Sequence, residues 1–446
     1  MSSTTSSGKV STSLARVRLS AWEVTGSVPG ARPSCASPQP GAPGEEPVIP
    51  PPGELVSSSL QRSTPSDVTA GELASVVSGN TDLGAALYRQ AVKPGQNLFL
   101  SPFSITQALA MIHGGARGNT ETQMRQALRF SLPQERLHPA MNALDQALQG
   151  RAANVQGQNG PPPELRVLNT TWGQKGLSFE PAFLDGLAQH YGAGMRVVDF
   201  ARESEPIRAR INEWVASETK GLIRDLLAEG TVNGDTRLVL TNVLYFKGRW
   251  SENFDPDRTQ DAPFHVLDGG TRQVKMMVRD GIIPRMRGEG FDALALPYKG
   301  GAFRMLLVVP DGGRFMDVES RLSVGFLDGV RQALAPRFTA LKMLRFQVET
   351  ALPLKDSLET LGMVDAFSSA ADCSGLTRQE RLRIAFVQHK AFVSVDEAGT
   401  EAGAATAVGA SPVSIPEPLV VDRPFLFLIE DVETKAVLFL GRVVTF

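Results

Sequence analysis

The sequence has little cysteine, little net charge and no long apolar run, and each scarcity excludes a class of protein. Cys35 and Cys373 are the two cysteines among 446 residues, so no disulfide framework is encoded and the redox compartment stays open. The net charge of −2 gives no strong attraction to nucleic acid or to anionic membranes. No apolar stretch approaches the roughly 18 residues that a spanning helix requires. We therefore expect neither a nucleic-acid partner nor a membrane span.

Common catalytic motifs are missing as well. The sequence contains no GxSxG, HExxH or CxxC. Ser101, Ser104 and His389 could in principle form a nucleophile and base, but nothing supplies an acidic residue to orient the histidine or an oxyanion hole. We expect these three residues to be buried polar groups hydrogen-bonded to one another. The chain is then not an enzyme, and we expect no metal site and no cofactor.

The composition divides the chain near residue 70. Residues 1–66 are rich in Ser, Pro and Gly, and Trp22 is their one aromatic residue. Such a segment cannot bury enough apolar surface to offset the entropy of ordering it. We expect residues 1–69 to form a disordered tail and residues 70–446 to form one folded domain. The tail also lacks the apolar core of a convincing signal peptide.

The folded part mixes helical and strand periodicities without a repeating strand–helix–strand order, which favours the α+β class. Hydrophobic residues make up 42% of the chain, enough for a large core. Residues 238–246 are too apolar for a strand with one exposed face, so they predict a central strand buried on both sides. The periodicities predict helices over 121–128 and 208–227, with a further helical pattern beginning at Leu73, and strands over 165–173, 303–310, 391–395 and 436–444.

One segment near the C-terminus is built almost entirely of small residues. Residues 397–407 read EAGTEAGAATA and follow the strand predicted over 391–395. As a strand, one face would carry Thr400, Ala402, Ala404 and Thr406, none large enough to obstruct entry between existing strands. The same composition is also typical of a flexible linker. The segment can therefore remain exposed as a loop or join a sheet.

A series of motifs resembles the serpin family of serine-protease inhibitors. They occur in the family's order, at 97–104 (NLFLSPFS), 113–120 (HGGARGNT), 240–250 (LTNVLYFKGRW), 387–392 (VQHKAF), 397–405 (EAGTEAGAA) and 422–429 (DRPFLFLI). A single short motif is weak evidence, whereas this many in register are not. The resemblance implies the serpin fold, with three β-sheets, eight or nine helices and an exposed C-terminal reactive loop. It also implies a five-stranded sheet that can accept one more strand.

The resemblance also assigns roles to individual residues. It implies a polar cluster beneath the opening of the sheet, which we call the gate cluster: Ser101, Ser104, Asn242 and His389. It implies a hinge formed by Glu397, Gly399, Thr400, Glu401, Ala402, Gly403, Ala404, Ala405 and Thr406. At the top of the sheet, Arg345 keeps the charge of the family's usual lysine and can pair with Glu397, with Trp250 nearby. The leucine before Arg345 replaces the family's proline.

The resemblance further implies a suicide-substrate mechanism, with Val413–Ser414 as the reactive bond. A target serine protease would form an acyl-enzyme at Val413, and the freed hinge would insert into the sheet and carry the protease along. Loop insertion in serpins is itself an established case of strand addition. The fifteen residues 399–413 would span roughly 50 Å when extended at about 3.3 Å each. The tethered protease would therefore be displaced across the body of the inhibitor.

The loop composition indicates the class of target. Between Ala398 and Asp422 there is no Arg, Lys or aromatic residue, so neither a trypsin-like nor a chymotrypsin-like pocket finds an anchor. Val413 suits elastase-like or subtilisin-like proteases. The alternatives are a non-inhibitory serpin acting as a carrier or chaperone-like scaffold, and an interaction scaffold whose sheet accepts peptides. The small hinge residues favour the inhibitor.

Three further expectations concern partners and place of action. Arg129, Arg136 and Arg151 are scattered and form no basic helix, so we expect no heparin site. Asn169 begins a formal glycosylation sequon but lies in a predicted strand, where we expect it to be buried. We expect a monomer that acts outside the cell, as the family usually does, although the tail also allows a cytoplasmic protein.

Overall fold

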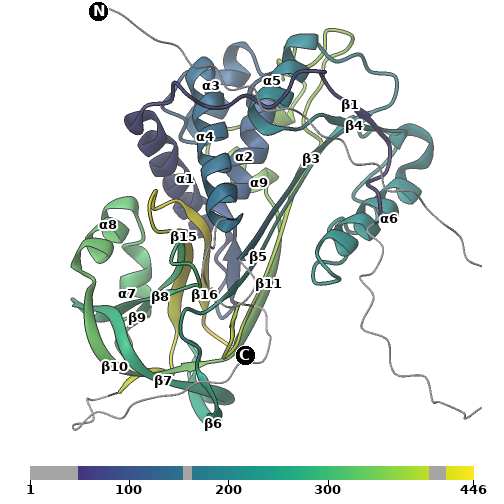
Figure 1. The fold of residues 1–446 in the computed structure, drawn as a ribbon. Coiled ribbons are helices and arrows are strands. Elements are labelled where there is room, and N and C mark those ends of the chain that lie inside the picture. Colours follow the sequence, from purple (N-terminus) through teal and green to yellow (C-terminus); the bar gives the residue numbers. More distant parts are fainter. Residues whose placement is uncertain (1–48, 154–162, 401–417) are drawn as a thin grey trace, which may run out of the picture. The chain divides into compact units, whose positions relative to one another are not determined.

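The computed structural model describes residues 49–153, 163–400 and 418–446 (Figure 1). Within these residues lie nine α-helices, which agrees with the expected α+β class and helix number. The helices are α1 (Ala70–Ala91), α2 (Pro102–His113), α3 (Gly118–Ala127), α4 (Gln134–Ala153), α5 (Pro181–Tyr191), α6 (Phe200–Glu218), α7 (Phe315–Ser320), α8 (Val324–Ala333) and α9 (Lys355–Thr360), with a short 3-10 helix η1 at Asp365–Phe367. No helix in the described ranges is long and apolar enough to cross a membrane.

Seven strands form the first sheet, in the order β1-β4-β3-β5-β13-β12-β11. Their bounds are β1 (Glu54–Val56), β3 (Glu164–Gln174), β4 (Met195–Val198), β5 (Leu238–Arg249), β11 (Phe346–Pro353), β12 (Phe386–Val395) and β13 (Gly399–Thr400). Without the short β1 and the two-residue β13, five strands remain. These correspond to the expected five-stranded sheet that can take one more strand.

Nine strands form the second sheet, in the order β14-β10-β7-β8-β9-β15-β16-β2, with β6 paired to β7. Their bounds are β2 (Leu98–Leu100), β6 (Asp255–His265), β7 (Thr271–Gly288), β8 (Phe291–Pro297), β9 (Phe303–Pro310), β10 (Ala335–Leu344), β14 (Leu419–Val421), β15 (Phe425–Asp431) and β16 (Val437–Val443). The described strands thus form two hydrogen-bonded sheets where three were expected. The reason is β7, whose 18 residues pair first with β6 and then with β8, and with β10 along most of this length.

The two faces of β5 belong to two different parts of the core. Figure 1 shows α6 on one side of the first sheet and α1, α2 and α4 on the other. Val239 and Val243 pack with Trp172 and with Trp214 of α6, whereas the leucines at 238, 240 and 244 pack in the larger core that contains α2. Strand side chains alternate between faces, so Asn242 points to the α2 side. The prediction that residues 238–246 form a central strand buried on both faces is confirmed.

Local signals explain where α2 begins, which matters because its first turn faces the sheet. Ser101 is the N-cap, and its hydroxyl accepts a hydrogen bond from the Ser104 N–H at 3.1 Å. Pro102 occupies the first helical position, where its missing N–H costs nothing. All twelve residues of α2 are buried, so the cap and first turn are held inside the protein.

Two boundaries differ from the sequence analysis. The helix predicted over 208–227 starts at Phe200 and ends at Glu218, because Lys220 and Gly221 take positive φ angles of 53° and 78°. The boundary placed at residue 70 is also too late. Strand β1 pairs with β4, and Arg62 binds the Asp145 carboxylate at 2.5 Å, so the folded domain begins before residue 70. The disorder predicted for residues 1–48 lies outside the described residues.

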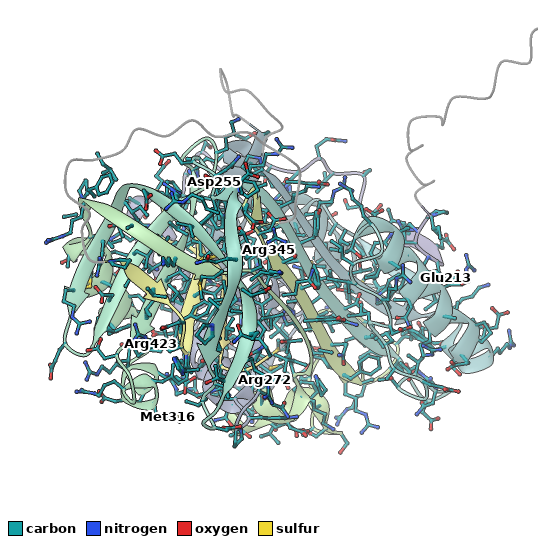
Figure 2. The ribbon with its side chains drawn as sticks, turned by 90° about the horizontal axis from the view of Figure 1, so that it is seen from below. Glu213, Asp255, Arg272, Met316, Arg345 and Arg423 are labelled. Carbon is teal, nitrogen blue, oxygen red and sulfur yellow. The ribbon has the colours of Figure 1, made fainter. Side chains whose placement is uncertain are left out.

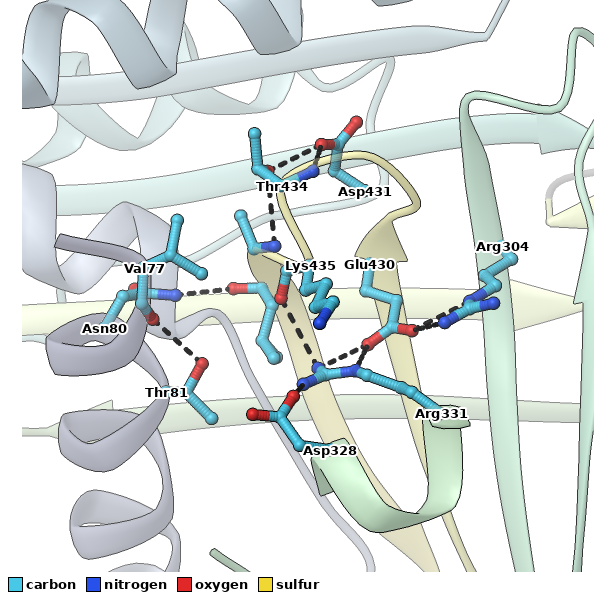
Figure 3. A network of polar contacts seen from close by, with 12 residues as sticks. Val77, Asn80, Thr81, Arg304, Asp328, Arg331, Glu430, Asp431, Thr434 and Lys435 are labelled. Carbon is cyan, nitrogen blue, oxygen red and sulfur yellow. Dashed lines mark hydrogen bonds and ion pairs between the residues drawn. The ribbon is translucent and has the colours of Figure 1, made fainter. Parts of the chain in front are cut away.

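A buried ionic network fixes the hairpin of β15 and β16 (Figure 3). The Glu430 carboxylate is fully buried and accepts hydrogen bonds from Arg304 of β9 at 2.8 Å and from Arg331 of α8 at 2.6 Å. Arg331 also binds Asp328 at 2.9 Å, which completes the neutralisation. Because a buried carboxylate needs such partners, Glu430 ties the hairpin to both α8 and β9.

Candidate functional site

The first hinge residues already lie inside the first sheet. Thr400 pairs with Val395 of β12 on one side and with Gly248 of β5 on the other, antiparallel to both strands. Further along, β5 and β12 pair directly and in parallel over six residues, beginning at Val239 and Phe386. The two strands therefore separate only at the end where the hinge enters, which we call the hinge end.

Close packing at this point requires the small residue that the hinge supplies. A Cβ atom on Gly399 would collide with the carbonyl oxygen of Gly248 and with the backbone of Arg249. The next residue, Thr400, is 2% exposed, and its hydroxyl forms a hydrogen bond of 2.7 Å with the Tyr298 hydroxyl. Complete burial raises the pKa of Tyr298, so this phenol stays neutral and keeps its hydroxyl proton.

The ion pair expected at the sheet top is present. Arg345 donates from Nε at 2.8 Å, and its Nη2 lies 2.6 Å from the same Glu397 oxygen, so one oxygen is used instead of two. The Thr259 hydroxyl reaches that oxygen too, at 2.5 Å. Burial disfavours the charged carboxylate, but the hydrogen bonds from Arg345 and Thr259 outweigh it and keep the pKa of Glu397 below its ordinary value. Arg345 and Asp255 are labelled in the view from below in Figure 2.

Trp250 lies beside the hinge and makes different contacts from those of the ion pair. Its ring stacks on Tyr298 with centroids 4.7 Å apart, and its Nε1 donates to the Asp396 carbonyl at 2.9 Å. Its backbone N–H donates to the Ala398 carbonyl at 2.9 Å. Trp250 thus fixes the chain leading into the hinge and the tyrosine that receives Thr400.

The four residues of the gate cluster are fully buried and in contact, as expected. His389 Nδ1 lies 2.5 Å from the Asn242 carbonyl oxygen, and the Ser101 backbone N–H donates to His389 Nε2 at 3.1 Å. The Asn242 amide donates to the Ser104 hydroxyl at 2.5 Å. Since Nε2 accepts, Nδ1 carries the proton. Burial lowers the pKa of His389 to about 3, which keeps the ring neutral.

The same contacts leave no room for catalysis by these side chains. His389 Nε2 is occupied by a backbone N–H, and the Ser101 hydroxyl caps α2, so no serine–histidine pair of the hydrolytic kind exists here. Among the described residues, no group of three or more His, Cys, Asp or Glu side chains could hold a metal ion. The geometry indicates a structural cluster.

Asn169 of β3 belongs to the gate cluster, which the sequence analysis missed. Its carbonyl oxygen accepts from the Ser104 hydroxyl at 2.9 Å and from the Asn242 amide, and its own amide donates to Gln107 at 2.9 Å. Asn169 is directly opposite Asn242 in the β3–β5 register. The strand prediction for Asn169 is correct, although its side chain is half-buried. An asparagine inside a predicted strand, on the same face as Val167, was the signal that could have revealed it.

The gate cluster therefore joins α2 to three neighbouring strands. Asn169 comes from β3, Asn242 from β5 and His389 from β12, and the start of α2 supplies both serines. Separating β5 from β12 must break the contact between Asn242 and His389. The remaining predicted site residues lie in 401–417, outside the described residues: Glu401, Ala402, Gly403, Ala404, Ala405, Thr406, Val413 and Ser414.

Comparison with known proteins agrees with this architecture. Residues 78–446 match the family model described as Serpin (serine protease inhibitor). The chain belongs to the serpin family. Leukocyte elastase inhibitor of Sus scrofa is 37% identical over 382 residues, which cover 81% of this chain and 97% of that protein.

Two further comparisons broaden this result. An uncharacterised serpin-like protein of Thermococcus kodakarensis is 36% identical over 361 residues, covering 80% of this chain and 82% of that protein. The crystal structure of uncleaved ovalbumin aligns with a TM-score of 0.74 at 26% identity, covering 83% of this chain and all of that one. The serpin is thus similar to these three proteins over 82% or more of the length of each.

Proposed function

We propose that this serpin is an inhibitor that traps elastase-like or subtilisin-like serine proteases by loop cleavage and strand insertion. The observation that carries the proposal is the placement of Gly399 and Thr400 between β5 and β12, with small residues following them in the sequence. Strand addition has already begun at the hinge end, and each later residue of the hinge would extend it in the same direction. The extracellular site of action and the monomeric state belong to the same proposal.

The covalent step follows from ordinary acyl transfer. The protease serine oxygen attacks the carbonyl carbon of Val413 and forms an ester, the bond to Ser414 breaks, and the new Ser414 amine leaves with a proton. Insertion must then outpace hydrolysis of that ester by water. The gate cluster acts in this proposal as the contact that keeps β5 and β12 together until the strand arrives.

Two observations support the proposed class of target protease: the loop sequence and the similarity to leukocyte elastase inhibitor. Val413 offers a small β-branched side chain to a shallow pocket, and no cation or ring stands nearby to serve another class of protease. The similarity to a leukocyte elastase inhibitor supports the same target class.

The test is incubation of the full chain with elastase, subtilisin and trypsin, followed by denaturing electrophoresis. We expect a complex that survives denaturation with elastase or subtilisin, and slow or no reaction with trypsin. Val413→Arg should transfer the preference to trypsin and keep the trapping. Faster trapping of trypsin by the unmodified chain would refute both the reactive bond and the target class.

Thermal unfolding separates the inhibitor from a non-inhibitory scaffold. Cleavage within 401–417 should raise the melting temperature strongly in an inhibitor, because the hinge then completes the sheet. A scaffold should gain little. Cleaved protein that melts with the intact chain would therefore favour the carrier or chaperone-like alternative.

A further inference from the structure

A strongly basic pocket lies where β5 and β12 begin, at the opposite end of these strands from the hinge. It is a cavity of about 590 Å³, and its lining contains four cationic side chains, which define what we call the basic pocket: Arg237, Lys355, Arg381 and Arg383. Asp235 is the one carboxylate in this lining. Positive charge therefore dominates locally in a chain that is nearly neutral overall.

Internal partners neutralise the basic pocket only weakly. Arg237 lies 3.6 Å from Glu380 and Lys355 lies 3.9 Å from Glu359, and such exposed pairs contribute little. Within the described ranges, the side chains of Arg381 and Arg383 have no hydrogen bond or ion pair. Arg381 acts from a distance on the carboxylate of Asp372, whose pKa is lowered mainly by its hydrogen bonds with Ser374. Arg136, by contrast, binds the Glu72 carboxylate at 2.5 Å. The guanidinium groups of Arg381 and Arg383 are therefore available to a ligand.

The lining matches one chemical class of ligand. A guanidinium group presents paired donors that fit two oxygens of a phosphate or sulfate. Ser369 lies in the same lining, and its hydroxyl group can donate to a further oxygen, whereas the Ser368 hydroxyl already donates to the Asp365 carbonyl at 3.1 Å. A volume of about 590 Å³ exceeds what one such ion would fill. We infer that the basic pocket binds an oligoanion of linked phosphate or sulfate groups.

The position of the pocket connects this ligand to the movement of the sheet. The Ala385 N–H donates to the Leu238 carbonyl at 3.0 Å, and direct pairing of β12 with β5 starts at the following residues. Arg237 immediately precedes β5, and Arg383 lies two residues before Ala385. A ligand held by both arginines would therefore bridge the two strands at this end.

A strand inserted from the hinge end would be long enough to reach the basic pocket. The twelve residues of β5 span about 40 Å, and the fifteen residues 399–413 span about 50 Å at 3.3 Å each. The end of the inserted strand would reach the basic pocket. A bridging ligand should therefore slow complete insertion, and this consequence rests on the proposed inhibitory function.

Binding is tested on the full chain by calorimetry and thermal unfolding in 0.15 M salt, with sodium tripolyphosphate in one arm and a heparin hexasaccharide in the other. We expect at least one of the two compounds to bind and to raise the melting temperature. Binding of tripolyphosphate would identify linked phosphates as the ligand, and binding of the hexasaccharide would identify linked sulfates. The variant Arg381→Gln/Arg383→Gln should bind at least tenfold more weakly, since hydrogen bonds to charged groups are each worth about a factor of ten.

The matched control is Arg210→Gln/Arg272→Gln, which removes the same charge from two exposed arginines away from the basic pocket. It should bind like the unmodified chain. Equal weakening in both double variants would show attraction to overall charge and would overturn the site. Absence of binding in both arms, or unchanged binding by Arg381→Gln/Arg383→Gln, would overturn it as well.

The effect on insertion is measured as the rate and stoichiometry of protease trapping with and without the bound oligoanion. We expect slower trapping and more released protease for the unmodified chain, and no effect for Arg381→Gln/Arg383→Gln. Tight binding with unchanged trapping would refute the bridging role. If the ligand-free chain traps no protease, the proposed function and the bridging role both fail, while the binding result stands.

Discussion

Replacing Thr400 with arginine tests whether insertion at the hinge end controls inhibition. Thr400 is buried between β5 and β12, and its hydroxyl bonds to that of Tyr298. An arginine at this position must either bury its guanidinium beside a neutral phenol or pull the hinge out of the sheet. We expect the hinge to be expelled and later insertion to be slowed, so that Thr400→Arg becomes a substrate of its protease.

The size of the effect on insertion follows from the interactions that the first sheet loses at position 400. The hydrogen bond to Tyr298 contributes about 1 kcal/mol, and burial of an unpaired guanidinium costs several kcal/mol more. Expulsion limits this cost, so we take an increase of about 3 kcal/mol in the insertion barrier, which slows insertion about 100-fold. Deacylation keeps its rate. The ratio of cleaved chain to covalent complex should then rise about 100-fold relative to the unmodified chain.

The assay is a titration of elastase or subtilisin with inhibitor, combined with electrophoresis to separate cleaved chain from covalent complex. Thr400→Val is the matched control, because it keeps the branched shape and the burial and loses only the hydrogen bond to Tyr298. It should trap protease nearly as well as the unmodified chain. If Thr400→Arg traps with unchanged stoichiometry, loop insertion is not how this serpin inhibits.

Three other predictions concern the packed body. His389→Ala leaves the side-chain oxygen of Asn242 and the backbone N–H of Ser101 without their partner, at a cost of about 1–3 kcal/mol each. Native electrophoresis should therefore show latent or polymeric protein at lower temperature, and an unchanged transition would contradict the gate role. Burial lowers the pKa of His138 from an ordinary 6.5 to about 3. As the pH falls from 6.5 toward 3, the unfolded chain therefore binds a proton at His138 that the folded chain does not, and the free energy of unfolding declines. Urea unfolding of His138→Gln should therefore depend less on pH across this window than that of the unmodified chain. Glu430→Gln should lower the free energy of unfolding by about 3–5 kcal/mol, whereas Glu433→Gln, at an exposed carboxylate, should change it by less than about 1 kcal/mol.

The gate cluster could be predicted because its members stand in motifs whose order along the chain is that of the family. The alternation of β5 also placed Asn242 on the face opposite that of Val243. Asn169 was missed for a physical reason. Periodicity shows which face a residue occupies, whereas the register between β3 and β5 decides which residues meet, and register is set by packing along the whole strand.

The errors at boundaries have similar causes. The helix predicted over 208–227 followed apolar spacing through Leu222, but the positive φ angles at Lys220 and Gly221 end the helical path just before it. The basic pocket was invisible in the sequence because Arg237 and Arg383 are far apart along the chain. They meet only because parallel strands bring the starts of β5 and β12 to the same end of a sheet.

The register of the hinge shows where the barrier to insertion should lie. Thr400 pairs with Gly248 and with Val395, so continuing the antiparallel ladders by six residues sets position 406 opposite both Asn242 and His389. Those two are already each other's partners. Every step of insertion exchanges one parallel ladder for two antiparallel ones and gains hydrogen bonds, but this step must first separate the histidine from the asparagine.

The side chain arriving at that step would be Thr406, on the face that Asn242 occupies. Its hydroxyl can both donate and accept, so it can take over the hydrogen bonds that the separated pair loses. In the proposed mechanism, the hydrogen bonds broken on opening would thus be replaced once the strand has passed. The gate cluster would then hold the sheet closed before cleavage and add no lasting cost afterwards, as rapid trapping requires.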